Sequence, residues 1–147
     1  MARYLVVAHQ TAASFELLSA IQDLASQEKD AEFVLLVPAT PVKHLLTWTE
    51  GEAEAVARAT ATEAARALRD AGLNLIESVV GPPDPLRAIQ QEHQSRRSPY
   101  SATIISTLPL GISRWLRRDL PNRVRAKLGV DVVHVVTNDP AKRPAVA

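Results

Sequence analysis

Short apolar runs alternate along this chain with longer stretches of helical periodicity, and this alternation constrains the fold more than any other feature. The apolar runs are rich in Val, Leu and Ile and have the length of buried strands. They lie at residues 3–8, 32–37, 73–80, 102–105 and 132–136. Helical patterns follow Thr11 and also occupy residues 49–71, 85–93 and 120–128. Strands that alternate with helices predict a three-layer α/β/α sandwich around a five-stranded parallel sheet.

Polar residues mark the expected starts of three helices. Thr11 is suited to cap the first helix, and Asp84 is suited to cap the third. Thr49 is followed three residues later by Glu52, which is the pattern of a capping box at the start of the second helix. These residues predict helix N-termini close to residues 12, 50 and 85.

Glycines mark the expected ends of two helices, because helices commonly stop at a residue in the left-handed conformation. Gly72 follows the second helix and Gly129 follows the last one. The second helix is rich in Ala, and helical spacing predicts the stripe that it buries against the sheet. That stripe consists of Val56, Thr60, Ala64, Ala67, Leu68 and Ala71.

Length and composition predict one compact domain over residues 1–137 and a flexible tail at 138–147. A chain of 147 residues, of which 46% are hydrophobic and 22% charged, is large enough for a well-packed core. From Thr137 onward the sequence contains two prolines, and Val146 is its one large apolar residue. We therefore expect the chain to fray from Thr137.

The composition also excludes several classes of protein. Without Cys, the chain forms no disulfide, carries out no thiolate chemistry and binds no metal through Cys. A net charge of +1 and 4% aromatic residues argue against a nucleic-acid partner. No apolar run reaches the roughly 18 residues of a transmembrane helix, and residues 1–8 enter a strand directly instead of forming a signal peptide. We expect a cytoplasmic protein with no membrane partner.

The segment 104–121 joins the fourth strand to the last helix and carries the densest set of candidate ligand-binding residues. In parallel α/β sheets, ligands bind where the carboxyl end of a strand meets a helix N-terminus. Hydroxyls and guanidinium groups at such a place suit an anion such as phosphate. Alternatively, the hydroxyls cap a local turn and the arginines form a solvated face. The residues concerned are Ser106, Thr107, Gly111, Ser113, Arg114, Arg117 and Arg118.

Histidine and tryptophan residues add further candidates. His9, at the carboxyl end of the first strand, is the best-placed histidine and could contact a sugar or phosphate or form part of a turn. The other histidines have no spacing typical of a metal site, and His134, in the middle of a strand, is expected to pack or to lie at an interface. Trp115 is expected in the core or at a dimer contact, with stacking on a base as the alternative.

The motifs of common enzyme classes are missing from the chain. It contains no Walker A loop, no Gly-x-Gly-x-x-Gly fingerprint and no Gly-x-Ser-x-Gly elbow. No pair of carboxylates falls at two strand ends to act as acid and base. Catalysis is therefore not expected. Weak ATP hydrolysis remains open, with Asp119 as the one acid near the candidate phosphate site.

Three segments resemble the universal stress protein family, and together the resemblance covers residues 3–136. Residues 5–11 resemble that family's first strand and the Asp-Gly-Ser turn after it. Residues 80–85, followed by Ile89, resemble its Gly-x-Pro entry into the third helix. Residues 122–136 resemble its Glu-Arg-Val helix and last strand.

This resemblance implies the strand order 3-2-1-4-5 of the adenine-nucleotide alpha-hydrolase-like fold. It also implies a homodimer formed through Val132–Val136, and ATP or AMP as a ligand between the first and fourth strand ends. At the first loop, His9 and Gln10 stand at the positions of the family's Asp and Gly. Only Thr11, at the position of the family's Ser, keeps a hydroxyl side chain. The chain resembles a divergent member, because the glycines of the family's phosphate loop are replaced. The residues at the corresponding positions are Ser106, Pro109, Asp119 and Leu120.

Two functional hypotheses follow. The first is a sensor or interaction domain that binds a nucleotide or another anion. Ala8, His9, Gln10, Thr11 and Val37 would hold base and sugar in this case. The phosphates would be held by Ser106, Thr107, Gly111, Ser113, Arg114 and Arg118. The second is a dimerisation module without nucleotide, in which the phosphate loop has degenerated. No metal ligand is predicted in either case.

Overall fold

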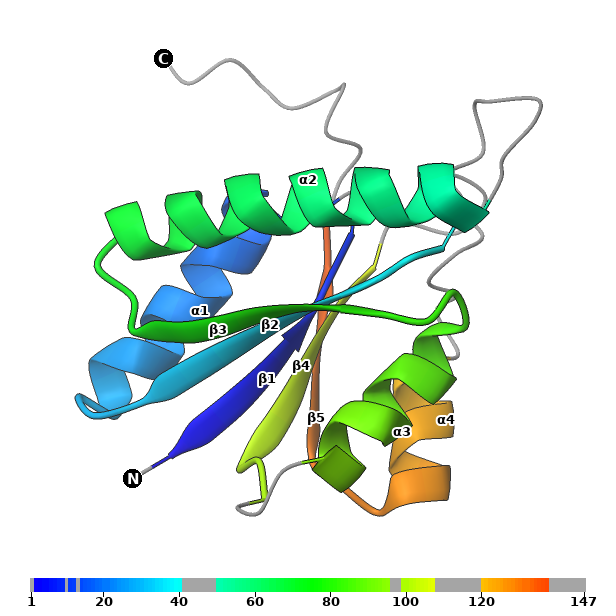
Figure 1. Ribbon diagram of the computed structural model, residues 1–147. Helices are drawn as coiled ribbons and strands as arrows, with labels where there is room; N and C mark the ends of the chain where they lie inside the picture. Colours follow the sequence, from blue (N-terminus) through cyan, green and yellow to red (C-terminus); the bar gives the residue numbers. More distant parts are fainter. Residues whose placement is uncertain are drawn as a thin grey trace.

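A computed structural model describes residues 2–9, 11–12, 14–40, 50–95, 99–107 and 120–137. Within these residues, strands and helices alternate strictly along the chain (Figure 1). The strands are β1 (Arg3–Val7), β2 (Glu32–Pro38), β3 (Leu75–Gly81), β4 (Ala102–Thr107) and β5 (Val132–Val136). The helices are α1 (Phe15–Gln27), α2 (Glu50–Asp70), α3 (Pro85–Ser95) and α4 (Leu120–Leu128).

The strands form one parallel sheet in the order β3-β2-β1-β4-β5, which confirms the predicted topology. β1 is central: Val6 pairs with Leu35 of β2 on one side and with Ile104 of β4 on the other. Helices α1 and α2 cover one face of the sheet, and α3 and α4 cover the other (Figure 1). Because both faces are covered, the central strands are apolar on both sides, and this produces the continuous apolar runs in the sequence.

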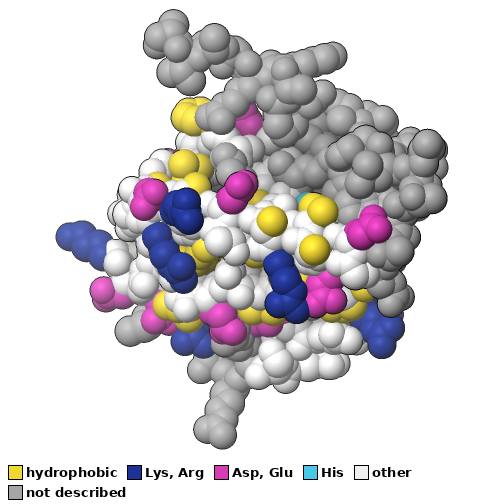
Figure 2. Space-filling model, turned by 45° about the horizontal axis from the view of Figure 1, so that its top comes forward, with side chains coloured by type: hydrophobic (Ala, Val, Ile, Leu, Met, Phe, Trp, Pro, Cys, Tyr) yellow, Lys and Arg dark blue, Asp and Glu magenta, His cyan; other side chains and the backbone are white. Residues whose placement is uncertain are grey.

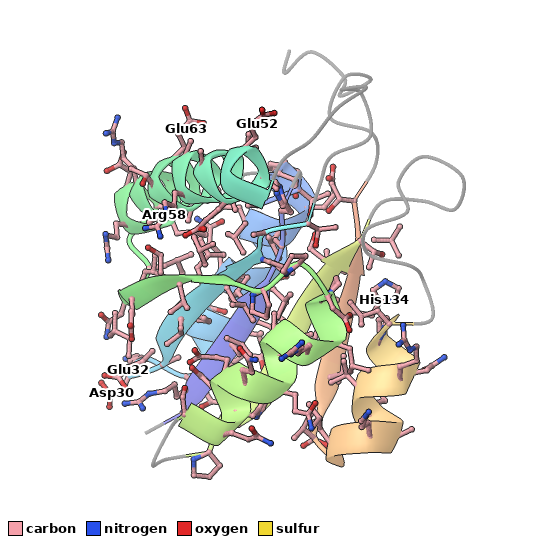
Figure 3. The ribbon with its side chains drawn as sticks, turned by 45° about the vertical axis from the view of Figure 1, so that its right-hand side comes forward. Asp30, Glu32, Glu52, Arg58, Glu63 and His134 are labelled. Carbon is pink, nitrogen blue, oxygen red and sulfur yellow. The ribbon has the colours of Figure 1, made fainter. Side chains whose placement is uncertain are left out.

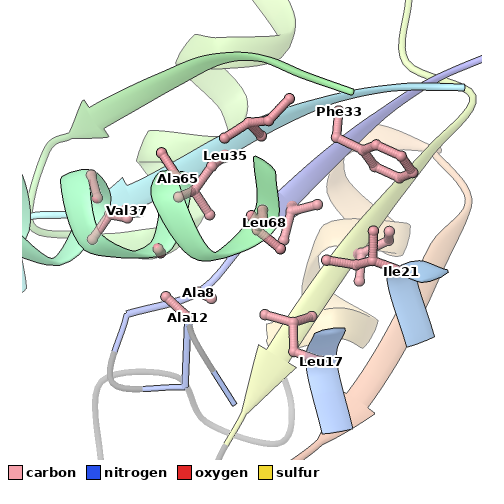
Figure 4. Packing of buried hydrophobic residues seen from close by; sticks show 14 of the residues in the cluster. Ala8, Ala12, Leu17, Ile21, Phe33, Leu35, Val37, Ala65 and Leu68 are labelled. Carbon is pink, nitrogen blue, oxygen red and sulfur yellow. The ribbon is translucent and has the colours of Figure 1, made fainter. Parts of the chain in front are cut away.

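Two hydrophobic clusters fill the spaces between the layers. The cluster under α1 and α2 is shown in Figure 4, where Leu17 and Ile21 of α1 and Leu68 of α2 approach Phe33 and Leu35 of β2. The cluster under α3 and α4 is built around Leu5, Leu36, Ile89, Ile105 and Val124. All ten of these side chains are at most 2% exposed, so burial of apolar area on both faces stabilises the sheet.

The predicted inward stripe of α2 is partly wrong. Ala64 and Leu68 are buried as predicted, but Val56 is 36% exposed and Thr60, Ala67 and Ala71 are only partly buried. The buried face is made mainly by alanines, which recur every four positions. Their small side chains let the helix approach the sheet closely. This face consists of Ala53, Ala57, Ala61, Ala64, Ala65 and Leu68.

The outer face of α2 carries charges of both signs. Figure 2 brings this side of the molecule forward and shows acidic and basic side chains interspersed over its described part. Arg58 forms an ion pair with Glu54, one helical turn earlier. Charges of mixed sign give no concentrated field for a strongly charged partner on this face.

The first helix begins three residues later than predicted. Ser14, in an extended conformation, caps α1 through its Oγ, which accepts from the Leu17 N–H at 3.2 Å. The prediction that Thr11 is the cap is wrong, because the loop after β1 continues to Ser14 and the Thr11 hydroxyl bonds to Ser106 instead. Asp84 caps α3 as predicted, with its Oδ1 accepting from the Leu86 N–H at 3.2 Å. Thr49 lies outside the described residues.

Both predicted helix-stop glycines are confirmed. Gly72 has φ +86° and Gly129 has φ +64°, which is the left-handed region where a side chain is strained. The third strand begins at Leu75 instead of residue 73, and a register shift beside Phe33 interrupts its pairing with β2. None of the helices in the described part of the chain combines the length and the apolar character that a membrane crossing needs.

Candidate functional site

The carboxyl ends of β1, β4 and β5 bring buried polar side chains to one edge of the sheet. His9 and Thr11 follow β1, Ser106 and Thr107 end β4, and Thr137 follows β5, and each is at most 2% exposed. The chain leaves β1 toward α1 on one face of the sheet and leaves β4 toward α4 on the other face. These strands therefore flank a topological switch point, where open α/β sheets bind their ligands.

A chain of hydroxyl groups links the three strand ends. Thr11 Oγ1 lies 2.6 Å from Ser106 Oγ, which in turn lies 3.2 Å from Thr137 Oγ1. Thr137 Oγ1 lies 3.2 Å from the Oγ of Ser14, which also accepts the Leu17 N–H at the start of α1. The first loop, β4, β5 and the N-terminus of α1 are thus joined by side chains that satisfy one another inside the protein.

Two members of this hydroxyl chain were missed by sequence reasoning. Ser14 was not considered, and Thr137 was assigned to the start of a frayed tail. That assignment is wrong for Thr137, which is completely buried and whose N–H donates to the Thr107 carbonyl at 2.8 Å. A polar residue directly after an apolar strand run was the available signal, because it marks the carboxyl edge where ligand-binding side chains gather.

The hydroxyl of Thr107 has a different partner. Its Oγ1 lies 2.6 Å from Nε2 of His134 on the neighbouring strand β5 (Figure 3). His134 is partly buried, which fits the expectation that it packs or lies at an interface and does not separate the two. The pair ties the end of β4 to the middle of the last strand.

His9 is held neutral by its surroundings. Its side chain is 2% exposed, and burial lowers the pKa of the imidazole from 6.5 to about 4. Its carbonyl accepts the Ala12 N–H at 3.1 Å in the loop after β1. Ala8 and Val37, at the ends of β1 and β2, are completely buried beside this loop, and the Ala8 N–H donates to the Leu36 carbonyl. The described wall of the site is therefore uncharged at neutral pH.

The other predicted site residues lie outside the described residues. They are Gln10, Gly111, Ser113, Arg114 and Arg118, together with Trp115, Pro109 and Asp119. The cationic half of the predicted anion site thus stays a prediction. Within the described ranges, no three His, Asp or Glu side chains gather as metal ligands do.

Three solved structures share this fold over nearly the whole chain. A universal stress protein family protein from Arabidopsis thaliana, with AMP bound, has a TM-score of 0.65 at 13% identity, covering 99% of this chain and 97% of its own. A universal stress protein from Archaeoglobus fulgidus has a TM-score of 0.63 at 13% identity, covering 92% and 98%. A protein of the same family from Burkholderia pseudomallei has a TM-score of 0.61 at 11% identity, covering 90% and 94%.

These similarities confirm at the level of the fold the resemblance seen in the sequence. The chain shares the α/β fold of these universal stress proteins, with its five-stranded parallel sheet in the order β3-β2-β1-β4-β5. No protein-family model matches the sequence, and no curated protein matches it either.

Proposed function

We propose that this chain is a universal-stress-protein-like sensor or interaction domain that binds an adenine nucleotide at the carboxyl ends of β1 and β4. The observation that carries the proposal is the cluster of buried polar side chains at the switch point between these two strands. The same fold holds AMP in the Arabidopsis protein, which makes an adenine nucleotide the first ligand to test.

The described wall suits the uncharged part of a nucleotide. The side chains of Ala8 and Val37 are completely buried and form an apolar backing behind this wall, and the neutral imidazole of His9 adds polar nitrogens without adding charge. A base and a ribose need this combination of apolar contact and a few hydrogen bonds. We therefore assign adenosine to the wall formed by β1, the loop after it and the end of β2.

The phosphates require positive charge, which the described wall does not supply. We assign them to Gly111, Ser113, Arg114 and Arg118 in the segment after β4, where the sequence places guanidinium groups and hydroxyls together. In the structure, the hydroxyls of Ser106 and Thr107 bond within the protein. Their proposed role is therefore to fix where that segment leaves the sheet.

A thermal-shift titration tests this function. ATP, ADP, AMP and inorganic phosphate are added at millimolar concentration, with and without magnesium, to the wild type, Arg114→Ala and the matched surface control Arg66→Ala on α2. We expect a nucleotide to raise Tm by several degrees, because a ligand that binds only the folded state stabilises it by roughly 2.7 kcal/mol at a hundred times its Kd.

The variants decide where the nucleotide binds. Arg114→Ala is expected to remove most of the rise in Tm, and Arg66→Ala is expected to keep it. Equal shifts for phosphate and AMP would reduce the proposal to an anion site without nucleoside recognition. No shift with any of the four ligands would refute nucleotide binding.

A second candidate function, dimerisation through β5, is favoured by the exposure of that strand. β5 ends the sheet, since β4 is its one strand neighbour within the described residues. Val136 is 43% exposed, and the other four residues of β5 are only partly buried. An apolar edge strand is a template for pairing with another chain.

Sedimentation equilibrium tests the dimer with two matched variants. Val136→Asp places a charge on β5, and Ile76→Asp places one on β3 at the opposite edge, where Ile76 is 39% exposed. We expect the wild type and Ile76→Asp to be dimers and Val136→Asp to be monomeric. A monomeric wild type, or a dimer that Val136→Asp leaves intact, would rule out this interface.

A further inference from the structure

A pocket of 210 Å³ lies between α3 and the edge strand β3, on the face of the sheet that α3 and α4 cover. Its apolar wall comes from the side chains of Leu36 of β2, Val79 of β3 and Ala88 of α3. It is separate from the candidate nucleotide site, which lies around the ends of β1 and β4. A space of this size takes a ligand of a few non-hydrogen atoms.

The polar part of the pocket is supplied by the last two turns of α3. Gln91, Glu92 and Ser95 line it, and Glu92 is the one charged side chain among the described residues of the lining. Glu92 is 7% exposed. A carboxylate this deeply buried is unusual, since charged groups are buried only when paired or hydrogen-bonded.

A network behind the pocket fixes the position of this carboxylate. The buried Tyr100 donates its hydroxyl to Glu92 Oε2 at 2.5 Å. The Tyr100 ring meets the edge of the His93 ring at a centroid distance of 5.3 Å, and His93 Nε2 lies 3.0 Å from Thr103 Oγ1. Tyr100 precedes β4 and holds the carboxylate directly, whereas Thr103 of β4 holds the His93 ring that packs against Tyr100.

The carboxylate acts on its surroundings as a negative charge. Burial lowers the pKa of His93, and the charge of Glu92 opposes that lowering. A fixed negative charge in the wall of a largely apolar pocket attracts a cation more strongly than the same charge in water would. A cation with an apolar part would also cover the side chains of Leu36 and Val79, which lie on this face of the sheet.

We propose that this pocket binds a small primary alkylammonium ion, with its ammonium group directed at Glu92 and its alkyl chain packed on β2 and β3. A primary ammonium has three N–H donors. Glu92 accepts one of them, and the hydroxyl of Ser95 and the amide oxygen of Gln91 are the neighbouring acceptors for the others. This site does not depend on nucleotide binding.

An NMR titration with n-butylammonium chloride tests the proposal. The matched ligand control is 1-butanol, which keeps the alkyl chain but lacks the charge, and sodium chloride controls for ionic strength. We expect saturable amide shifts at Val79–Gly81 and at residues 91–95 with butylammonium and none with sodium chloride. Butanol is expected to bind at least about tenfold more weakly, because it lacks the charge that Glu92 attracts.

Two variants separate the charge from the shape of the pocket. Glu92→Gln keeps an oxygen that can accept from Tyr100 and is expected to weaken butylammonium binding by about tenfold or more. Gln91→Lys, at an exposed position, places an ammonium on the protein itself beside Glu92 and is expected to compete with the ligand. Glu63→Gln, on the outer face of α2 (Figure 3), is the charge control and is expected to bind as the wild type does.

The proposal is supported if Glu92→Gln and Gln91→Lys both weaken butylammonium binding and Glu63→Gln leaves it unchanged. Absence of saturable shifts, equal binding of butanol, or unchanged binding in both pocket variants overturns it. Should Glu92→Gln fail to fold, Gln91→Lys alone decides, since its side chain lies at the rim.

Discussion

Acidification is predicted to destabilise the fold through His9 more than through any other histidine that the structure describes. The imidazole is 2% exposed, and burial lowers its pKa from 6.5 to about 4. Because the pKa is lower in the folded state, the unfolded chain binds the proton more readily between these two values. The contribution of His9 to the free energy of unfolding is therefore constant above pH 7 and falls as the pH drops from 6.5 toward 4.

The size of this effect follows from the difference between the two pKa values. A difference of about 2.5 units, at 1.36 kcal/mol per unit, corresponds to about 3 kcal/mol between pH 7.5 and pH 4. This is a large fraction of the roughly 5–15 kcal/mol that holds a typical domain folded. Protonation of carboxylates also contributes below pH 5, so the effect of His9 must be isolated by comparison.

Urea denaturation of the wild type and His9→Gln, at several pH values from 7.5 to 4.5, isolates it. Gln has a similar reach and does not titrate, so carboxylates and His93 contribute equally to both curves. The difference in the free energy of unfolding between His9→Gln and the wild type is expected to shift in favour of the variant by about 2–3 kcal/mol between pH 7.5 and pH 4.5. Parallel curves would refute the reasoning, because they would mean that the imidazole accepts a proton in the folded state without penalty.

Three further predictions concern stability, each measured by urea denaturation at pH 7.5. A double-mutant cycle with Thr11→Val and Ser106→Ala is expected to show a coupling of about 1 kcal/mol, because the two hydroxyls lie 2.6 Å apart and buried; additive losses would contradict a bond between them. Gly81→Ala is expected to cost about 1–3 kcal/mol, because its Cβ would lie 2.8 Å from the Ala88 Cβ. Ala88→Gly should recover part of that loss, and a neutral Gly81→Ala would show that α3 shifts freely. Gly72→Ala is expected to lower the free energy of unfolding by about 1 kcal/mol. Its backbone φ of +86° is the only cause, since nothing lies within 4 Å of the added methyl, and an unchanged stability would contradict backbone strain.

The layers of the fold could be predicted from the sequence because strands buried on both faces leave a continuous apolar signal. Leu5, Leu35 and Ile104 belong to such runs, and all three are completely buried in the central strands. The strand order came from the family resemblance and not from the residues alone, since right-handed crossovers leave several orders open.

The details of α2 could not be predicted from hydrophobicity. Val56 is the largest apolar residue in the first half of that helix, yet it points outward and is 36% exposed. Small side chains such as Ala57 and Ala61 take the inner face, because close approach of a helix to a sheet depends on side-chain volume as well as on hydrophobicity.

The strand ends that carry the candidate site residues could be predicted, but the bonds between those residues could not. Thr11 and Ser106 were both expected after apolar strands, and the family resemblance made these two strands neighbours. Ser14 and Thr137 lie 123 positions apart and bond only because the topology brings α1 beside β5. No local pattern in the sequence encodes such a contact, so the hydroxyl chain became visible only with the strands in place.

The most direct test of the proposed nucleotide site is an amide NMR titration of the protein with AMP, with inorganic phosphate as the control ligand. The account predicts saturable shifts at Ala8, His9, Val37 and Thr107 that AMP produces and phosphate alone does not, with residues 75–77 of β3 unaffected. Shifts confined to other parts of the sheet, or none up to millimolar AMP, would contradict nucleotide binding at the carboxyl ends of β1 and β4.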